Sequence, residues 1–243
     1  MNPNQFTLAA TTNELAQETR VREVADVVEF RMDKAETPVA QVAEYTGELP
    51  ILATNRGRWF GGQASDTGRL DQLFAASEFK TVEAVDIELE TVRGTGWVVQ
   101  EFRANDVDVV VSVHDFEQTP DVETLVAIFE ECAGHGDVAK VATYANERAD
   151  SLRMLEAIET ATSRGIRVAG ISMGGVGSHT RAVAPLYGSE LGYAPLHSDT
   201  SEYAPGQIPI RELDSLVTTL NRFDTGRCEP SPDQPQETTQ SKR

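Results

Sequence analysis

The amino-acid sequence predicts an α/β protein with a single (β/α)8 barrel, or TIM barrel, over residues 1–225. Two observations favour this fold. Eight short apolar runs recur along the chain, and amphipathic segments with helical spacing separate them. Strands that alternate with helices in this way are typical of βαβ units and a parallel sheet. An open doubly wound sheet fits the same alternation and is the alternative architecture.

The predicted strands are rich in Val, Ile and Ala and lack a strict apolar–polar alternation. That composition is expected of strands buried on both faces in a parallel sheet. The predicted strands span residues 6–10, 25–32, 50–54, 84–89, 107–113, 137–143, 166–172 and 192–196.

Three helices are indicated by apolar residues that recur three and four positions apart. Their stripes are Leu70, Leu73 and Phe74; Val122, Leu125, Val126 and Phe129; and Leu213, Leu216, Val217 and Leu220. Residues 119–123 have the composition of a helix start. Residues 226–243 carry three prolines among polar residues without apolar periodicity, which predicts a disordered polar tail.

The charge balance limits the partners of this protein. Lys and Arg number 21 against 39 Asp and Glu, a formal net charge of −18. Such a charge argues against nucleic acid and anionic membranes as partners. It also destabilises the fold by self-repulsion that salt screens, so we expect a salt-adapted, halophilic protein, with an ordinary acidic protein as the alternative.

The sequence also indicates a cytoplasmic location. No apolar run approaches 18 residues, which argues against a membrane span, and the first residues resemble no secretion signal. Cys132 and Cys228 are expected to be unpaired thiols in a reducing compartment, Cys132 on the apolar stripe of a helix. His135, His179 and His197 show no ligand spacing, so we expect no metal site.

Lys140 is the first candidate for catalysis, because it lies within the apolar run 137–143. Burial disfavours an ammonium ion, lowers the pKa of the amine and frees it as a nucleophile that can form an imine with a ketone. The alternative is a structural lysine that extends to water or pairs with a carboxylate.

His114 is the second candidate. It ends the run 107–113 and shares a strand face with Ser112, and Lys140 is expected on the next strand. An imidazole at a strand end can move protons near neutral pH. A hydrogen-bonded structural histidine is the alternative.

Further charged residues follow other predicted strands. Glu29, Arg31 and Asp33 alternate onto one face, where they form a structural ion network or hold a polar ligand. Arg56 follows the run 50–54, and the pair Asp86 and Glu88 shares a face of the run 84–89; for these we favour supporting contacts.

Two glycine-containing loops come next. Residues 172–181 form a Gly-rich turn after a strand, which can present backbone N–H groups to an anion. Arg181 can bind a carboxylate through two hydrogen bonds, or is a surface arginine beside a tight turn. Residues 204–208 contain a Pro-Gly turn, from which Gln207 can cover a ligand.

Taken in order, these segments resemble the type I 3-dehydroquinate dehydratases, Schiff-base enzymes of the shikimate pathway of aromatic amino-acid biosynthesis. The resemblance covers most of residues 5–225. The matching segments are Glu29-Phe30-Arg31-Met32-Asp33, Pro50-Ile51-Leu52 through Arg56, Asp86-Ile87-Glu88-Leu89, Ser112-Val113-His114-Asp115-Phe116 with Thr119-Pro120, Lys140, Met173-Gly174 through Arg181, and Ala204-Pro205-Gly206-Gln207.

The resemblance implies a homodimer without a metal or organic cofactor that converts 3-dehydroquinate to 3-dehydroshikimate and water. It places the imine on Lys140 and the proton transfers on His114. Glu29, Arg31 and Arg56 are expected to hold the ring hydroxyls. The remaining two, Arg181 and Gln207, are expected to bind the carboxylate. The three arginines together are expected to make a positive basin for this anionic substrate in an acidic protein.

Two positions depart from the family pattern. Phe60 stands before Gly61-Gly62, where the family often has a glutamate that assists the histidine, and Tyr203 stands where serine often precedes Ala-Pro-Gly-Gln. We expect the Tyr203 hydroxyl to substitute for the serine in binding substrate. A class I aldolase, which shares a strand lysine in a barrel, and a non-catalytic barrel that binds an anionic metabolite are the alternative functions.

Overall fold

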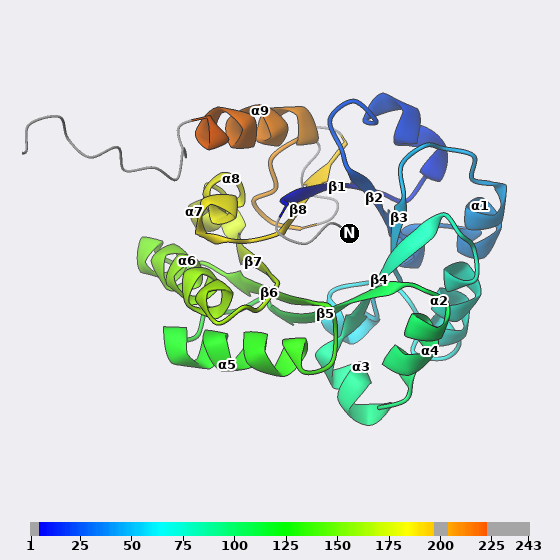
Figure 1. Ribbon diagram of the computed structural model, residues 1–243, viewed down its shortest axis with the longest axis horizontal. Coiled ribbons are helices and arrows are strands. Elements are labelled where there is room, and N and C mark those ends of the chain that lie inside the picture. Colours follow the sequence, from blue (N-terminus) through cyan, green and yellow to red (C-terminus); the bar gives the residue numbers. More distant parts are fainter. Residues whose placement is uncertain (1–4, 197–203, 223–243) are drawn as a thin grey trace, which may run out of the picture.

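The computed structural model describes residues 5–196 and 204–222 and contains an eight-stranded parallel barrel (Figure 1). The predicted (β/α)8 class is therefore confirmed over the open-sheet alternative. The expected tail, residues 226–243, and Tyr203 lie outside the described residues. The strands are β1 (Thr7–Thr12), β2 (Val27–Arg31), β3 (Ile51–Thr54), β4 (Val82–Glu88), β5 (Asp108–Asp115), β6 (Val138–Tyr144), β7 (Val168–Met173) and β8 (Leu191–Pro195).

Each predicted strand is present, and each end lies within two residues of its predicted position. Neighbouring strands pair in parallel register from β8 through β1 to β7. Among the described residues, β7 and β8 form no regular ladder. They are joined by an isolated bridge between Val168 and Ser189, with the Glu190 N–H donating to the Val168 carbonyl at 2.8 Å. The Ser189 hydroxyl also accepts a hydrogen bond from the Gly170 N–H at 3.3 Å, so the barrel is closed by a few local contacts rather than by a ladder.

The helices lie outside the barrel (Figure 1). The α-helices are α1 (Pro38–Glu44), α2 (Arg69–Ser77), α3 (Leu89–Gly94), α4 (Val98–Ala104), α5 (Val122–Ala133), α6 (Arg148–Ser163), α7 (Gly174–Gly177), α8 (Thr180–Val183) and α9 (Ile210–Asn221). The 3-10 helices are η1 (Leu15–Arg20), η2 (Met32–Lys34), η3 (Arg58–Phe60) and η4 (Ala184–Tyr187).

The three apolar stripes fall on α2, α5 and α9, as predicted. The helix start is also confirmed, because the Asp121 carboxylate accepts a hydrogen bond from the Thr124 N–H at 2.8 Å and caps α5. The alternation of strands with helices is confirmed, although the helix that follows β1 is the 3-10 helix η1. The six residues of η1 bury only Leu15 and Glu18, so they offer no continuous apolar face for a longer helix.

The barrel interior is layered because alternate side chains of each strand point inward. Near the amino ends of the strands the interior is apolar, and its small and branched side chains include Ala9, Val27, Leu52, Ala84, Val110, Val138, Ala169 and Leu191. Two residues further along, the inward positions of β2, β4 and β6 are Glu29, Asp86 and Lys140, all buried. The fold therefore places ionisable groups directly above an apolar layer.

Outside the barrel, a second core fills the space between strands and helices. Phe30, Phe102 and Phe129 are among its fully buried members, and Cys132 on α5 is buried there as expected. Among the described residues, the helices include none with both the length and the apolar character needed to cross a membrane.

A matched pair of leucines tests this packing. Leu125 on α5 is fully buried in the outer core, whereas Leu152 on α6 is 66% exposed. We expect Leu125→Ala to lower the free energy of unfolding by about 2–5 kcal/mol, since it removes buried methyl groups and leaves a cavity. Leu152→Ala should change it by no more than about 0.5 kcal/mol. Urea unfolding at constant high salt measures both; equal losses would contradict the described core.

Candidate active site

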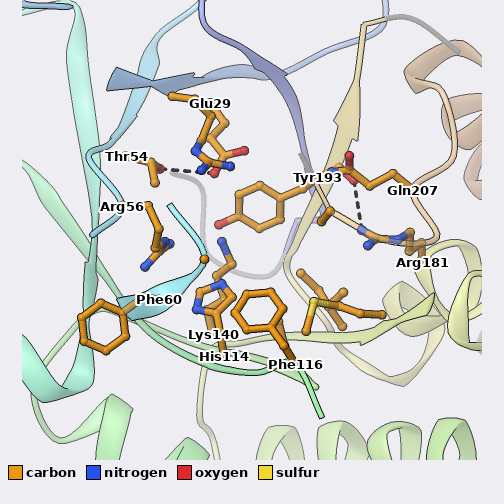
Figure 2. A pocket seen from close by; sticks show the side chains of 16 residues that line it. Glu29, Thr54, Arg56, Phe60, His114, Phe116, Lys140, Arg181, Tyr193 and Gln207 are labelled. Atoms are coloured by element: carbon orange, nitrogen blue, oxygen red, sulfur yellow. Dashed lines mark hydrogen bonds between the residues drawn. The ribbon is translucent and has the colours of Figure 1, made fainter. Parts of the chain in front are cut away.

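A cavity opens at the carboxyl ends of the strands, where the loops of a (β/α)8 barrel build active sites (Figure 2). It encloses ≈ 550 Å³ of space, part of which is open to solvent. The structure brings together every predicted site residue that it describes. These are Glu29, Arg31, Arg56, His114, Lys140, Arg181 and Gln207.

Lys140 lies on β6 at the centre of the cavity and is only 4% exposed. Its Nζ donates to Oδ2 of Asp86 at 2.8 Å. Burial lowers the pKa of the amine, although the negative charges of Asp86 and Glu29 oppose that shift. The lysine is therefore buried, as expected, and it is also paired with a carboxylate.

Asp86 joins Lys140 to a buried ion network. Its Oδ1 accepts from Ser112 Oγ at 2.6 Å and lies 2.8 Å from Nη2 of Arg56. Burial alone would raise the pKa of Asp86, but the charges of Arg56 and Lys140 outweigh it and hold the pKa below its ordinary value. Glu88 extends the network, at 3.3 Å from Arg56 and 2.9 Å from Arg69. Asp86 is thus an ionised anchor for the lysine.

His114 lies on β5, where Ser112 pairs with Lys140 of β6 and His114 with the residue two positions further on. The ring is half-buried and stacks on Phe116, with centroids 6.0 Å apart. Among the described residues its solvent-inaccessible Nδ1 has no hydrogen-bond partner. Burial, followed by the charges of Arg56 and Lys140, lowers the pKa of His114 well below its ordinary value. The imidazole is therefore neutral at neutral pH.

Phe60 lines the same cavity as His114. It ends η3, at the position where the sequence comparison with the family expected a carboxylate. Phe116 stacks on His114, and Phe60 adds a second aromatic side chain to the cavity wall (Figure 2).

Glu29 and Arg31 lie on the inner face of β2, as predicted, while Asp33 lies in η2. Thr11 and Thr54 donate to the two carboxylate oxygens of Glu29 at 2.7 and 3.2 Å. Asp33 accepts two hydrogen bonds from Arg31, from Nε at 2.7 Å and Nη2 at 2.8 Å. Both the network and the ligand-facing interpretations of this segment are therefore satisfied.

Arg181 differs from the other cavity arginines. Its guanidinium donates to the backbone carbonyls of Gly206, Pro205 and Tyr193, at 3.0, 3.4 and 3.4 Å. Among the described residues it has no carboxylate partner, and burial lowers its pKa to about 10. An unpaired buried cation favours an anion beside it.

This contrast corrects the expectation that three arginines make one positive basin. Arg31 is neutralised by Asp33, and Arg56 by Asp86 and Glu88. The positive charge available to a ligand is therefore concentrated at Arg181, next to Gln207. Gln207 is 8% exposed, and its buried Oε1 has no partner among the described residues.

Glycines let the loop of Gln207 approach this site. Gly174 and Gly206 both have left-handed φ, +86° and +72°, and a Cβ on Gly206 would lie 2.2 Å from the Gly174 carbonyl oxygen. The close contact of the two backbones requires glycine. It holds the carbonyl groups that orient Arg181.

Sequence reasoning missed Tyr193 on β8. It is 4% exposed, and its ring lies over Nζ of Lys140, 3.7 Å from the ring centroid. The residue lies in a short apolar run, where an aromatic side chain is ordinarily part of the core. The sequence could have indicated its role only through its position two residues after Leu191, which places both side chains on the inner face of the strand. Among the described residues no cluster of His, Cys, Asp and Glu could hold a metal ion.

The chain is similar to known proteins both in sequence and in overall structure. Residues 6–224 match the family described as "Type I 3-dehydroquinase". The chain is 46% identical over 226 residues to 3-dehydroquinate dehydratase of Haloarcula marismortui, covering 90% of this chain and 98% of the relative. The corresponding enzyme of Halobacterium salinarum is 41% identical, with 90% and 100% covered. The structure resembles 3-dehydroquinate dehydratase of Geobacillus kaustophilus with a TM-score of 0.81 and 27% identity, over 90% of this chain and 93% of that one.

The depressed pKa of His114 predicts a pH dependence of stability. Below an ordinary histidine pKa of about 6.5, His114 is protonated in the unfolded chain but stays neutral in the folded protein. The free energy of unfolding therefore falls as the pH drops from 7 to 5. The slope from this group is up to about 1.4 kcal/mol per pH unit. His114→Gln should remove that part of the slope in urea unfolding, while His135→Gln controls for loss of a histidine. An unchanged slope in His114→Gln would contradict the assignment.

Proposed function

Because the chain belongs to the type I 3-dehydroquinase family, its activity is the dehydration of 3-dehydroquinate in the shikimate pathway, and we propose that the reaction proceeds through an imine on Lys140. The observation that carries this mechanism is a buried amine, bound to a carboxylate, in the same cavity as a neutral imidazole. The family and its named relatives favour this reaction over the aldolase and the non-catalytic barrel.

Imine formation is assigned to Lys140 and Asp86. The lowered pKa of the amine increases its uncharged fraction, and the uncharged amine adds to the ring ketone with loss of water. The resulting iminium is a cation that withdraws electrons from the adjacent carbon. Asp86, which holds Nζ at 2.8 Å and is itself ionised, then serves as the counter-ion of that iminium.

Proton transfer is assigned to His114. Its neutral imidazole removes the proton from the carbon next to the iminium, which leaves an enamine. The imidazolium returns that proton to the departing hydroxyl, so water leaves and the carbon–carbon double bond forms. Hydrolysis of the imine then releases 3-dehydroshikimate and the free amine. This route takes its electron sink from the imine, so it uses neither a metal nor an organic cofactor.

Substrate binding is divided between the two sides of the cavity. Glu29, Arg31 and Arg56 are proposed to hold the ring hydroxyls, since each lines the cavity. The carboxylate is assigned to Arg181 and Gln207, because an unpaired guanidinium lies there. Tyr203 remains a proposed binding residue outside the described part of the chain.

The setting of the enzyme rests on the family and on charge. We propose a homodimer, by analogy with the family, in a reducing, salt-rich cytoplasm. A formal net charge of −18 and the similarity to enzymes of Haloarcula and Halobacterium support the salt-adapted interpretation. We propose a small anion as the substrate; the negative charge argues against nucleic acid and anionic membranes as partners.

Borohydride trapping tests the imine. Reduction during turnover of 3-dehydroquinate should add a stable mass to Lys140, because borohydride converts an iminium to a secondary amine. Lys140→Ala should lose both the adduct and the activity, while Lys80→Ala, which changes an exposed lysine, should keep both. Peptide mass spectrometry locates the adduct. Turnover without any adduct on Lys140 would falsify the imine route.

A second experiment tests the carboxylate site. Replacing Arg181 by Met should raise KM about 10- to 100-fold, as expected for loss of charge-assisted hydrogen bonds to an anion. Arg181→Lys keeps the charge but not the two-pronged geometry and should fall between. Arg164→Met, a change in an exposed ion pair, is the control. A fall in kcat with an unchanged KM would instead make Arg181 a support for the 204–207 loop.

A further inference from the structure

Tyr193 lines the cavity beside Lys140, and the proposed mechanism assigns it no role. It lies on β8, its ring covers Nζ of Lys140, and it is 4% exposed. Its hydroxyl has no hydrogen-bond partner among the described residues. Figure 2 shows the hydroxyl pointing into the cavity beside the lysine amine rather than into the barrel wall.

A buried hydroxyl without a protein partner is costly, and one that faces a cavity can find its partner in a bound ligand or water. Phenylalanine would fill the same space and cover the amine equally well, without the unpaired polar atom. The hydroxyl therefore indicates an acceptor on the substrate, and its place beside Nζ indicates which acceptor. The ketone oxygen is the substrate atom that must come next to the attacking amine.

We propose that the Tyr193 hydroxyl donates a hydrogen bond to the ketone oxygen while Lys140 adds to the ketone carbon, and that its ring holds the amine in place for attack. The inference rests on the imine mechanism proposed above and assigns Tyr193 a catalytic role in its first step. Donors placed where charge develops on an oxygen stabilise the transition state of such additions.

The addition proceeds through a carbinolamine. The Nζ lone pair forms the carbon–nitrogen bond, and the carbonyl π pair moves onto oxygen, where the Tyr193 O–H stabilises the negative charge. A proton then passes from the new ammonium to that oxygen and gives the carbinolamine. A second proton, supplied by solvent at the open mouth of the cavity, lets the oxygen leave as water, and the nitrogen lone pair forms the iminium. Tyr193 keeps its own proton throughout.

The surroundings of Tyr193 suit a donor that is not consumed. Burial, with the charges of Asp86 and Glu29, raises the pKa of the phenol well above its ordinary value, so it stays protonated. Asp86 cannot take the role, because a carboxylate accepts hydrogen bonds and its oxygens already contact Lys140, Ser112 and Arg56. His114 is engaged at the neighbouring carbon. The phenol is the donor that the geometry leaves available.

Two variants separate the hydroxyl from the ring. Tyr193→Phe removes the donor and keeps the aromatic face, whereas Tyr193→Leu removes both. Tyr187→Phe, at a 42% exposed tyrosine outside the cavity, is the matched control. Enzyme is mixed with 3-dehydroquinate and quenched with borohydride at increasing times, and the adduct on Lys140 is counted by mass spectrometry.

Tyr193→Phe should form the adduct about 10- to 100-fold more slowly than the unmodified enzyme, by comparison with loss of an oxyanion donor elsewhere. Tyr193→Leu should be slower still by about tenfold, because leucine no longer provides the ring that covers Nζ and holds the amine in place for attack. In Tyr193→Phe the isotope effect of deuterium on the carbon that loses its proton should shrink, because the earlier step then limits turnover. A merely structural role would not move that isotope effect.

Adduct formation at the unmodified rate in Tyr193→Phe, with an adduct present on Lys140, would overturn this inference and leave the imine mechanism intact. Turnover by the unmodified enzyme without any adduct would overturn both. If Tyr193→Phe does not fold, 3-fluorotyrosine placed at position 193 keeps the shape and makes a stronger donor. Its adduct should form at least as fast as with tyrosine, and slower formation would count against the proposal.

Discussion

The contact between Lys140 and Asp86 organises this site. Two opposite charges, each nearly inaccessible to solvent, meet at 2.8 Å above the apolar layer of a barrel interior. Neither group would remain ionised there alone, because a buried charge loses its hydration and needs an opposite charge beside it to offset that cost. Asp86 in turn depends on Arg56 and Ser112, and Arg56 on Glu88. The lysine is therefore held by a chain of contacts across β3, β4, β5 and β6.

That network also explains how an acidic protein attracts an anion. Arg31 forms an ion pair with Asp33, and Arg56 forms ion pairs with Asp86 and Glu88. These two arginines therefore shape the cavity without making it strongly positive. Arg181 is held by backbone carbonyls, which orient the guanidinium and leave its charge uncompensated. A formal net charge of −18 would repel the substrate at long range, and salt shortens that repulsion to about a Debye length.

Much of the fold and of the site could be predicted from the sequence, because the period of two along a strand fixes which side chains point inward. Glu29, Arg31, His114 and Lys140 were identified as polar residues in otherwise apolar runs, and all line the cavity. Tyr193 could not be, since an aromatic residue in an apolar run is ordinarily core. The pairing of Asp86 with Lys140, 54 positions apart, depends on barrel register, which the sequence pattern does not reveal.

The environment of His114 determines how strong an acid and base the imidazole is. With Phe60 and Phe116 on the wall, burial and two nearby cations keep the imidazole neutral, ready to accept a proton. The same environment makes it a weak base and its conjugate acid a strong one. A strong acid suits the departure of hydroxide as water, but a weak base can remove a carbon-bound proton only if that carbon is strongly acidified. In the proposed mechanism this acidification comes from a protonated imine, and the ionised Asp86 beside Nζ favours the protonated form. With Phe60 where the family resemblance predicted a carboxylate, the proposed proton transfer depends more strongly on Asp86, the carboxylate beside the lysine.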